Sequence, residues 1–393
     1  MSTRRTAWCA GGLAVVAAAV VAAAAQNAPP YDVVIRNGRI VDGTGNPWYS
    51  GDVAIRGGRI ATIGRLGNVP AARSIDAAGF IVSPGFIDLH THSDGPVLAD
   101  GNAESKVRQG VTLDVLGESG SVAPADGLLE DGDRHGQAPR WTTFTGYFER
   151  LEKQKTSINI ISHVAAGQVR RVVVGYAPRA ATPAERSRMR QLVARSMEEG
   201  AWGLVTRFES GGPEHPDEIL EMAKVVASYG GNYTTHIGSE GFEQEKELAF
   251  AFRVAREARL PVHIFHLKIR GRDLWDTMPA HLRRIEGARA SGLDITANVY
   301  PYPAMFHGWS AFFPVWAREG GPAAFAARLR DPAARERIKR DPEFIAWVKE
   351  HGSWDGIVMA RASREDNKKY EGKPLAEIAK LMGQPTRRTP VST

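Results

Sequence analysis

Two histidines separated by one residue follow an apolar run near residue 90. The run FIDLHTH at 86–92 places His90 and His92 on either side of Thr91, and Asp94 lies two residues further on. Successive side chains of a β-strand point to opposite faces, so the two imidazoles are predicted to share one face. Neutral imidazoles beside a carboxylate are a common ligand set for zinc and related ions. The pattern therefore predicts one half of a metal site.

Two further histidines occupy comparable positions later in the chain. His236 ends the apolar part of NYTTHIG (232–238), and His266 follows the apolar part of PVHIFHLK (261–268). Four of the 11 histidines thus stand at the ends of candidate strands, which packing in a hydrophobic core does not explain. We therefore expect the four imidazoles to converge on one metal site.

Seven short apolar runs could position these histidines, and longer amphipathic stretches separate several of them. The runs are FIDLHTH (86–92), VTLDVLG (111–117), NIISHVA (159–165), GLVTRF (203–208), NYTTHIG (232–238), PVHIFHLK (261–268) and DITANVYPY (294–302). Residues 183–200 and 216–229 have the proline and glycine signals of helix ends. Repeated strand and helix units with polar strand ends predict an α/β fold, a TIM-type (β/α) barrel. Because a closed barrel has eight strands, we expect an incomplete barrel that lacks the eighth.

A smaller β-rich region precedes these runs. The segments YDVVIRNGRIVDG and GDVAIRGGRIATIG each place a turn, Asn37-Gly38 or Gly57-Gly58, before an Arg-Ile pair, as in hairpins of one sheet. The predicted organisation is a β-sandwich module at 27–83 and a barrel domain at 84–381 with an insertion after the seventh strand. An unstructured tail is expected at 382–393.

Residues 1–26 have the pattern of a secretory signal peptide. Arg4 and Arg5 precede an uncharged stretch rich in Ala and Val at 10–25, which is shorter than the roughly 20 residues of a membrane span. We predict cleavage near Ala25, export to the periplasm or the medium, and no stable membrane association afterwards. An uncleaved anchor is the alternative. Cleavage would remove the only cysteine, Cys9, so no disulfide is expected.

The composition excludes several classes of protein and of partner. The 393 residues are 43% apolar, which excludes collagen-like and low-complexity chains. Lys and Arg number 50 against 44 Asp and Glu, so the net charge is +6, or +4 without the two arginines of residues 1–26. This charge is mild and its arginines are interspersed with acids, so nucleic acid is not an expected partner.

Five segments occur in a characteristic order between residues 31 and 381. They read FIDLHTHSD, QGVTLDVLGESG, THIGSEG, HIFHLK and ANVYPY. Together they resemble the amidohydrolase superfamily, most closely its N-acyl-D-amino-acid deacylase (D-aminoacylase) family. The resemblance implies a barrel attached to a small β-sandwich, one or two Zn²⁺ ions at the barrel mouth, and a water that attacks an amide carbonyl. The implied substrate is a small N-acyl amino acid, which is cleaved to a carboxylate and a D-amino acid.

The resemblance also implies a set of metal ligands. Four are the strand-end histidines, namely His90, His92, His236 and His266. The family's bridging cysteine lies in a GNCG-like turn, which reads GESG at 117–120 in this chain. A serine hydroxyl is a poor zinc ligand, whereas a glutamate is an anionic oxygen donor. We therefore predict Glu118 as the fifth ligand, with Ser119 as the alternative.

Two residues resemble the family's substrate-binding groups. Lys268 lies two residues past His266, where the family binds the free carboxylate of the substrate, and Tyr300 resembles a tyrosine that helps to hold it. Tyr302 is the alternative to Tyr300. Other amidohydrolases carry a modified lysine at the fourth strand, but GLVTRFESGG has none, which weakens a dihydropyrimidinase-like or dihydroorotase-like interpretation.

The catalytic acid/base of the family has no counterpart in this sequence. In the family it is an aspartate of an SDG-like motif on the eighth strand, and no such motif occurs here after Gly320. We therefore expect a C-terminally truncated member with impaired activity, in which the catalytic residue is unknown and Asp94 is the first candidate. Two alternatives stay open: an inactive metal-binding or ligand-binding remnant, and an amidohydrolase that cleaves a cyclic amide or a dipeptide.

Overall fold

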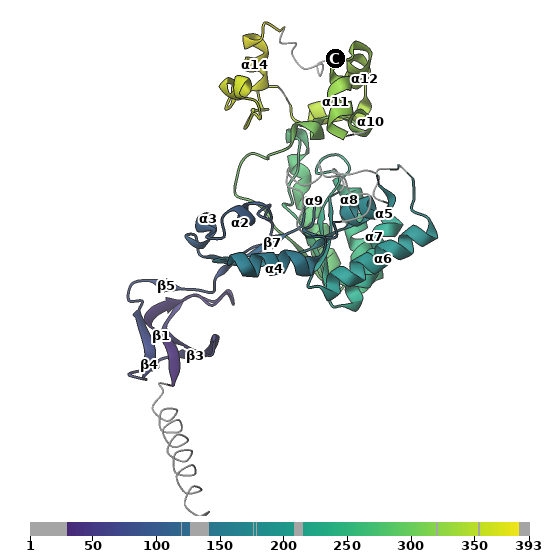
Figure 1. The fold of residues 1–393 in the computed structure, drawn as a ribbon. Helices are drawn as coiled ribbons and strands as arrows, with labels where there is room; N and C mark the ends of the chain where they lie inside the picture. The colour runs from purple at the N-terminus through teal and green to yellow at the C-terminus, as the bar shows by residue number, and fades with distance from the viewer. Residues whose placement is uncertain are drawn as a thin grey trace, which may run out of the picture. The chain divides into compact units, whose positions relative to one another are not determined.

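The computed structural model describes residues 30–118, 120–125, 141–175, 177, 179–207, 215–319, 321–352 and 354–384 (Figure 1). The chain divides into two compact units, and the boundary in the sequence falls between Phe86 and Ile87. The expected signal peptide, Ser119 and residues 385–393 of the expected tail lie outside the described residues, so export of the protein stays a prediction. Within the described part, the structure contains no helix with the length and hydrophobicity of a membrane span.

The N-terminal unit is built on one five-stranded sheet. Its strands follow the order β3-β2-β1-β4, and β5 also pairs with β1. Their bounds are β1 (Tyr31–Ile40), β2 (Tyr49–Arg56), β3 (Arg59–Gly64), β4 (Ala71–Asp76) and β5 (Ile81–Val82). Strand β1 runs antiparallel to β2 and parallel to β4 and β5.

One of the two predicted hairpins is confirmed and the other is wrong. Gly57 and Gly58 join β2 to β3 with φ values of 57° and 71°, which glycine adopts without steric cost. Asn37 and Gly38, in contrast, lie within β1, where the register to β2 shifts. The chain absorbs the irregularity as a bulge, in which the Asn37 backbone N–H donates to the Asp52 carboxylate at 2.9 Å.

Two further sheets follow along the chain, with the orders β6-β7-β8 and β13-β12-β11-β10-β9. Strand β7 runs parallel to β8, and the second sheet is parallel throughout. The strands are β6 (Phe86–Asp88), β7 (Val111–Leu116), β8 (Asn159–Ser162), β9 (Val164–Ala165), β10 (Gly203–Arg207), β11 (Asn232–His236), β12 (Val262–Ile264) and β13 (Ile295–Ala297). Only His163 separates β8 from β9, so the predicted run NIISHVA supplies one strand to each sheet. The strands are therefore neighbours in chain order, as in a (β/α) barrel. In the described ranges, no further strand pairs with the outer side of β6 or β13.

Helices alternate with these strands along the chain (Figure 1). They are α2 (Pro96–Ala99), α3 (Glu104–Val107), α4 (Phe144–Gln154), α5 (Ala166–Val174), α6 (Pro183–Glu198), α7 (Pro216–Ser228), α8 (Gln244–Val254), the π-helix η2 (Ala255–Arg259), the 3₁₀-helix η3 (Arg272–Thr277) and α9 (Met278–Ala290). Helix α6 begins as predicted, with Pro183 in its first turn and a capping box between Thr182 and Glu185.

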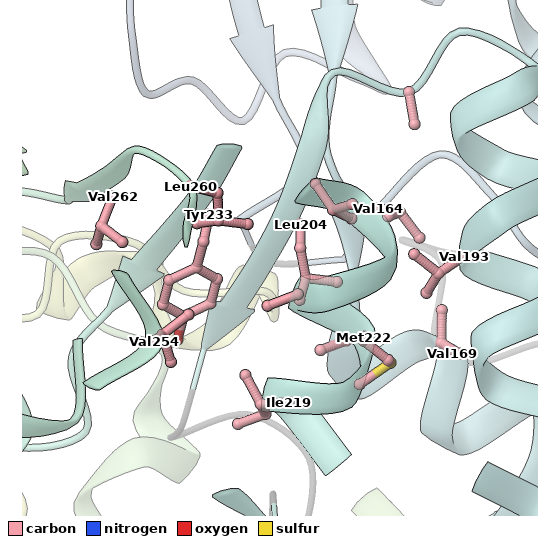
Figure 2. Close-up of a cluster of buried hydrophobic side chains, with 14 of the residues drawn as sticks. Val164, Val169, Val193, Leu204, Ile219, Met222, Tyr233, Val254, Leu260 and Val262 are labelled. Atoms are coloured by element: carbon pink, nitrogen blue, oxygen red, sulfur yellow. The ribbon is translucent and has the colours of Figure 1, made fainter. Parts of the chain in front are cut away.

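The main core lies between these helices and the parallel strands. Figure 2 shows Leu204 of β10, Tyr233 of β11, Val193 of α6 and Met222 of α7 packed in this layer, and all four are buried. Val205 follows Leu204 on β10 and belongs instead to a separate buried cluster with Ala165 and Phe265. A strand with apolar residues on both faces is typical of a parallel sheet that is covered on both sides.

A series of short helices follows β13. They are η4 (Trp309–Phe312), α10 (Val315–Arg318), α11 (Gly321–Arg330), α12 (Pro332–Lys339), α13 (Pro342–Glu350), η5 (Glu365–Tyr370) and α14 (Leu375–Leu381). The Asp331 and Asp341 side chains cap the N-termini of α12 and α13. Helix α13 is attached to the loop after β12 by a buried ion pair, in which Arg270 Nε lies 2.5 Å from Glu350 Oε2.

Candidate metal centre

The ends of four strands bring the candidate ligands together. His90 and His92 follow β6, Glu118 follows β7, His236 ends β11 and His266 follows β12. In a (β/α) barrel the carboxyl ends of the strands lie at one end of the barrel, so residues that follow different strands meet there.

The Glu118 carboxylate lies at the middle of this group. Its Oε2 lies 3.6 Å from His90 Nε2 and 3.4 Å from His92 Nε2, while its Oε1 lies 3.0 Å from His236 Nδ1. Both imidazoles of the His-x-His segment thus lie near the same carboxylate oxygen, although the two histidines follow β6 and do not belong to it. Ser119, the alternative to Glu118, lies outside the described residues.

These residues form two sets that could hold a metal ion. One set is His90, His92 and Glu118, the other is Glu118, His236 and His266, and the donor atoms of each set lie within 4.8 Å of one another. Two tetrahedral zinc ligands at about 2.1 Å from the metal lie about 3.4 Å apart. The distances from Glu118 Oε2 to His90 Nε2 and His92 Nε2, 3.6 Å and 3.4 Å, are close to that spacing, as expected for ligands of one zinc-sized ion.

Burial and charge also suit a cation. Glu118, His236 and His266 are 5%, 4% and 8% exposed, and the Nε2 atom of His90 is buried as well. Burial alone would raise the pKa of Glu118, but hydrogen bonds with His236 and His90 and the charge of Arg207 hold that pKa far below its usual range. The site therefore presents an anionic oxygen among imidazole nitrogens, which is a fitting donor set for zinc.

A glycine turn directs Glu118 into the site. Gly117 has φ of 121°, which breaks the alternation of side chains after Leu116, a residue of the main core. A Cβ atom at Gly117 would lie 2.7 Å from the carbonyl oxygen of His163. Both the backbone conformation and the space therefore require glycine at this position.

Replacing Gly117 with alanine is expected to destabilise the fold and to displace Glu118. An L-residue at this φ is strained by about 1–3 kcal/mol, and the contact with His163 adds to that cost. Urea unfolding measures the first effect and zinc affinity the second. Gly95→Ala is the matched control because a Cβ atom there meets no atom within 4 Å. Equal stability of the two variants would contradict this account of the turn.

His266 reaches the site through an unusual backbone conformation. Its φ is 35°, in the left-handed region that non-glycine residues rarely adopt. The side-chain oxygen of Asn298 accepts the His266 backbone N–H at 2.5 Å and so holds this conformation. The preceding Phe265 stacks on the His90 ring, with centroids 4.2 Å apart. Phe265 therefore packs against one candidate ligand, His90, and the next residue, His266, is itself a candidate ligand.

Lys268 and Tyr300 lie beside His266. Lys268 Nζ lies 2.9 Å from His266 Nδ1, donates to Glu240, and stands 5.2 Å from the centre of the Tyr300 ring. Burial, and then the negative charge of Glu240, raise the pKa of Tyr300 to about 12. The alternative, Tyr302, is 72% exposed, so Tyr300 is the tyrosine closer to the candidate ligands.

Asp94 follows His92 by two residues. Burial lowers the pKa of His92 and outweighs the charges of Glu118 and Asp94, which act to raise it. The Tyr147 hydroxyl donates to the Asp94 backbone carbonyl at 3.3 Å. This bond connects the backbone at Asp94 to α4.

Two site residues were missed by the sequence interpretation. Arg207 ends β10, and its Nε lies 3.6 Å from Glu118 Oε1. Glu240 is 1% exposed and lies 2.9 Å from His266 Nδ1. Burial would raise the pKa of Glu240, but the hydrogen bond with His266 and the charge of Lys268 lower it to about 2. The sequence pattern that could have identified Glu240 is THIGSEG, in which the glutamate follows His236 by four residues.

The relatives of this chain are amidohydrolases. The family model described as "Amidohydrolase family" matches residues 73–299, and the model of the urease alpha-subunit N-terminal domain matches residues 7–85. A D-aminoacylase of Alcaligenes xylosoxydans xylosoxydans is 33% identical over 290 residues, which are 71% of this chain and 59% of that protein. An N-acyl-D-glutamate deacylase of the same organism is 34% identical over 284 residues, 69% of this chain and 57% of that protein.

A solved structure extends the similarity to three dimensions. The N-acyl-D-glutamate deacylase from Bordetella bronchiseptica, in complex with zinc and a phosphonate mimic of the tetrahedral intermediate, has a TM-score of 0.72 and 27% identity. The match covers 90% of this chain and 68% of that chain. This chain spans less than two thirds of the length of the two curated relatives above. On the family match, the sequence similarity and the shared fold, the chain belongs to the amidohydrolase family.

Proposed function

We propose that this protein is a zinc-dependent hydrolase that cleaves the amide bond of N-acyl-D-amino acids. The observation that carries the proposal is the position of Glu118, whose two carboxylate oxygens face two different sets of histidines. The D-aminoacylase and N-acyl-D-glutamate deacylase relatives support the choice of an acylated D-amino acid as substrate.

Five residues would hold the metal. They are His90, His92, Glu118, His236 and His266. With one oxygen towards each set, Glu118 would bridge two ions or complete the coordination of one. Zinc bound there would activate a water molecule and polarise the amide carbonyl. Arg207, beside the same carboxylate, would partly balance its charge.

Lys268 and Tyr300 would bind the free carboxylate of the substrate. The ammonium group lies next to His266, so a carboxylate bound there would place its acyl amide near the candidate metal ligands. The Lys268 ammonium group also donates a hydrogen bond to Glu240. A bound substrate carboxylate would therefore compete with Glu240 for the N–H groups of Lys268.

Proton transfer needs a separate group. A positioned acid/base takes a proton from the attacking water and gives one to the leaving amine, a contribution of about 10²–10⁴ in rate. Asp94, two residues after the candidate ligand His92, is the group that we propose for this role.

The proposed function is tested with the full chain loaded with zinc. We expect release of the D-amino acid from N-acyl-D-methionine or N-acyl-D-glutamate, little release from the L-enantiomers, and loss of turnover after chelation. Turnover of a hydantoin or a dipeptide instead would favour a different amidohydrolase activity. Zinc binding with no turnover of any of these substrates would favour an inactive metal-binding protein and overturn the proposal.

Replacing Lys268 with alanine is expected to raise KM for an N-acyl-D-amino acid by about 10–150-fold. A charged hydrogen bond contributes roughly 1.5–3 kcal/mol, which corresponds to that range. Steady-state kinetics on the N-acyl amino acid and on its uncharged carboxamide analogue measure the effect. Lys246→Ala, which removes an exposed lysine of α8, is the control. An equal loss on both substrates would show that Lys268 does not serve carboxylate recognition.

A further inference from the structure

Glu240 is a buried carboxylate beside His266 for which the proposed chemistry has no role. It follows β11 in the loop after His236 and is 1% exposed. Its Oε1 lies 2.9 Å from His266 Nδ1 and also accepts a hydrogen bond from Lys268 Nζ. Its Oε2 has no hydrogen-bond partner within the described residues. One oxygen of this carboxylate, Oε1, therefore contacts both His266 and Lys268.

The hydrogen-bond chemistry at His266 Nδ1 presents a choice between two tautomers. Lys268 Nζ lies 2.9 Å from the same nitrogen and can only donate, whereas an ionised Glu240 can only accept. If Nδ1 accepts from Lys268, the proton of the neutral imidazole sits on Nε2, which then cannot bind a metal. If Nδ1 donates to Glu240, the lone pair lies on Nε2, and Nε2 can bind a metal.

We propose that Glu240 is a positioning residue that holds the His266 proton on Nδ1 and directs Nε2 towards the metal. The inference rests on the proposed function, since it assigns His266 as a ligand. A carboxylate that accepts the second N–H of a metal-binding histidine orients the ring and makes it a better ligand. Lys268 also donates a hydrogen bond to the Glu240 carboxylate and so holds it in place next to the His266 ring.

The backbone around His266 and Glu240 is held by separate contacts. The Asn298 side chain accepts the His266 backbone N–H, and the Glu240 carbonyl accepts the Arg270 backbone N–H at 2.6 Å. A change confined to the Glu240 side chain removes none of these bonds. The Glu240→Gln variant therefore tests the state of the His266 ring and leaves the backbone that presents it in place.

The experiment is a zinc titration of the metal-free chain in competition with a chromophoric chelator. We expect Glu240→Gln to weaken zinc binding about 10–100-fold at the set that contains His266. Binding at His90, His92 and Glu118 should be unchanged. Glu247→Gln is the matched control, because Glu247 supports the same loop by accepting the Gly238 backbone N–H at 3.3 Å.

The outcomes separate this inference from the proposed function. A wild-type chain that binds no zinc would overturn the proposed function. Normal zinc binding by both wild type and Glu240→Gln would overturn the role of Glu240 alone. Equal weakening in Glu240→Gln and Glu247→Gln would show that Glu240 only supports the loop, and would also overturn the inference.

A spectroscopic measurement on the wild-type chain tests the same point without a variant. Nitrogen chemical shifts of ¹⁵N-labelled histidine distinguish a protonated ring nitrogen from an unprotonated one. We expect His266, assigned by its loss in a His266→Gln sample, to be protonated at Nδ1 and unprotonated at Nε2. Protonation at Nε2 would overturn the inference even if Glu240→Gln failed to fold.

Discussion

Replacing Glu118 with glutamine is expected to lower zinc affinity by more than 100-fold and to abolish amide hydrolysis. Loss of an outer hydrogen-bond partner of a metal ligand costs about 10–100-fold, and the loss of an anionic ligand should exceed that. Among the described residues, Glu118 belongs to both of the sets that could hold a metal. The substitution also removes a negative charge next to Arg207. Zinc titration and steady-state turnover measure the two effects.

Two variants make this test specific. Glu104→Gln removes an exposed carboxylate that pairs with Arg108 at 3.0 Å, and zinc affinity should not change. Ser119→Ala tests the other residue of the turn. If Ser119→Ala abolished zinc binding and Glu118→Gln did not, the ligand role would pass to Ser119.

Replacing Arg170 with methionine is expected to lower the free energy of unfolding by about 3–5 kcal/mol, because it leaves a buried carboxylate without its cation. Arg170 of α5 and Glu218 of α7 are each 4% exposed, with Nη1 3.2 Å from Oε2. The arginine also donates to the carbonyl oxygens of Ala177 at 2.9 Å and Arg179 at 2.5 Å. These bonds hold the chain between α5 and α6 against α7, so their loss should be cooperative.

Urea unfolding followed by tryptophan fluorescence measures the change in stability. Arg253→Met is the control, since Arg253 forms exposed pairs with Asp217 and Glu257, and such pairs contribute only about 0–1 kcal/mol. The double variant with Glu218→Leu should recover much of the loss, because it removes the uncompensated charge. A loss below about 1 kcal/mol in Arg170→Met would show that the pair is not a determinant of stability.

The strands and helices that position the site were largely predictable from local patterns. Apolar runs such as VTLDVLG and NYTTHIG mark buried parallel strands, and the proline and capping signals at Thr182 and Pro183 mark the start of α6. These signals are local because strand and helix periodicities and end caps involve residues close in sequence. The hairpin expected at Asn37-Gly38 failed because pairing with β2 and β4 overrides a local turn preference.

The sequence by itself determined the types of the candidate ligands and the strand ends from which they come. The apolar run before each histidine was enough to select His90, His92, His236 and His266. Glu118 was selected because GESG resembles the turn that carries the family's bridging cysteine. Only the tertiary structure decided which of their atoms face one another. The left-handed backbone conformation at His266 depends on a hydrogen bond with Asn298, 32 residues away. Arg207 and Glu118 lie close together although they belong to the ends of different strands. The partnership of Glu240 with His266 likewise arises because parallel strands bring distant loops to one edge, a juxtaposition that no local pattern encodes.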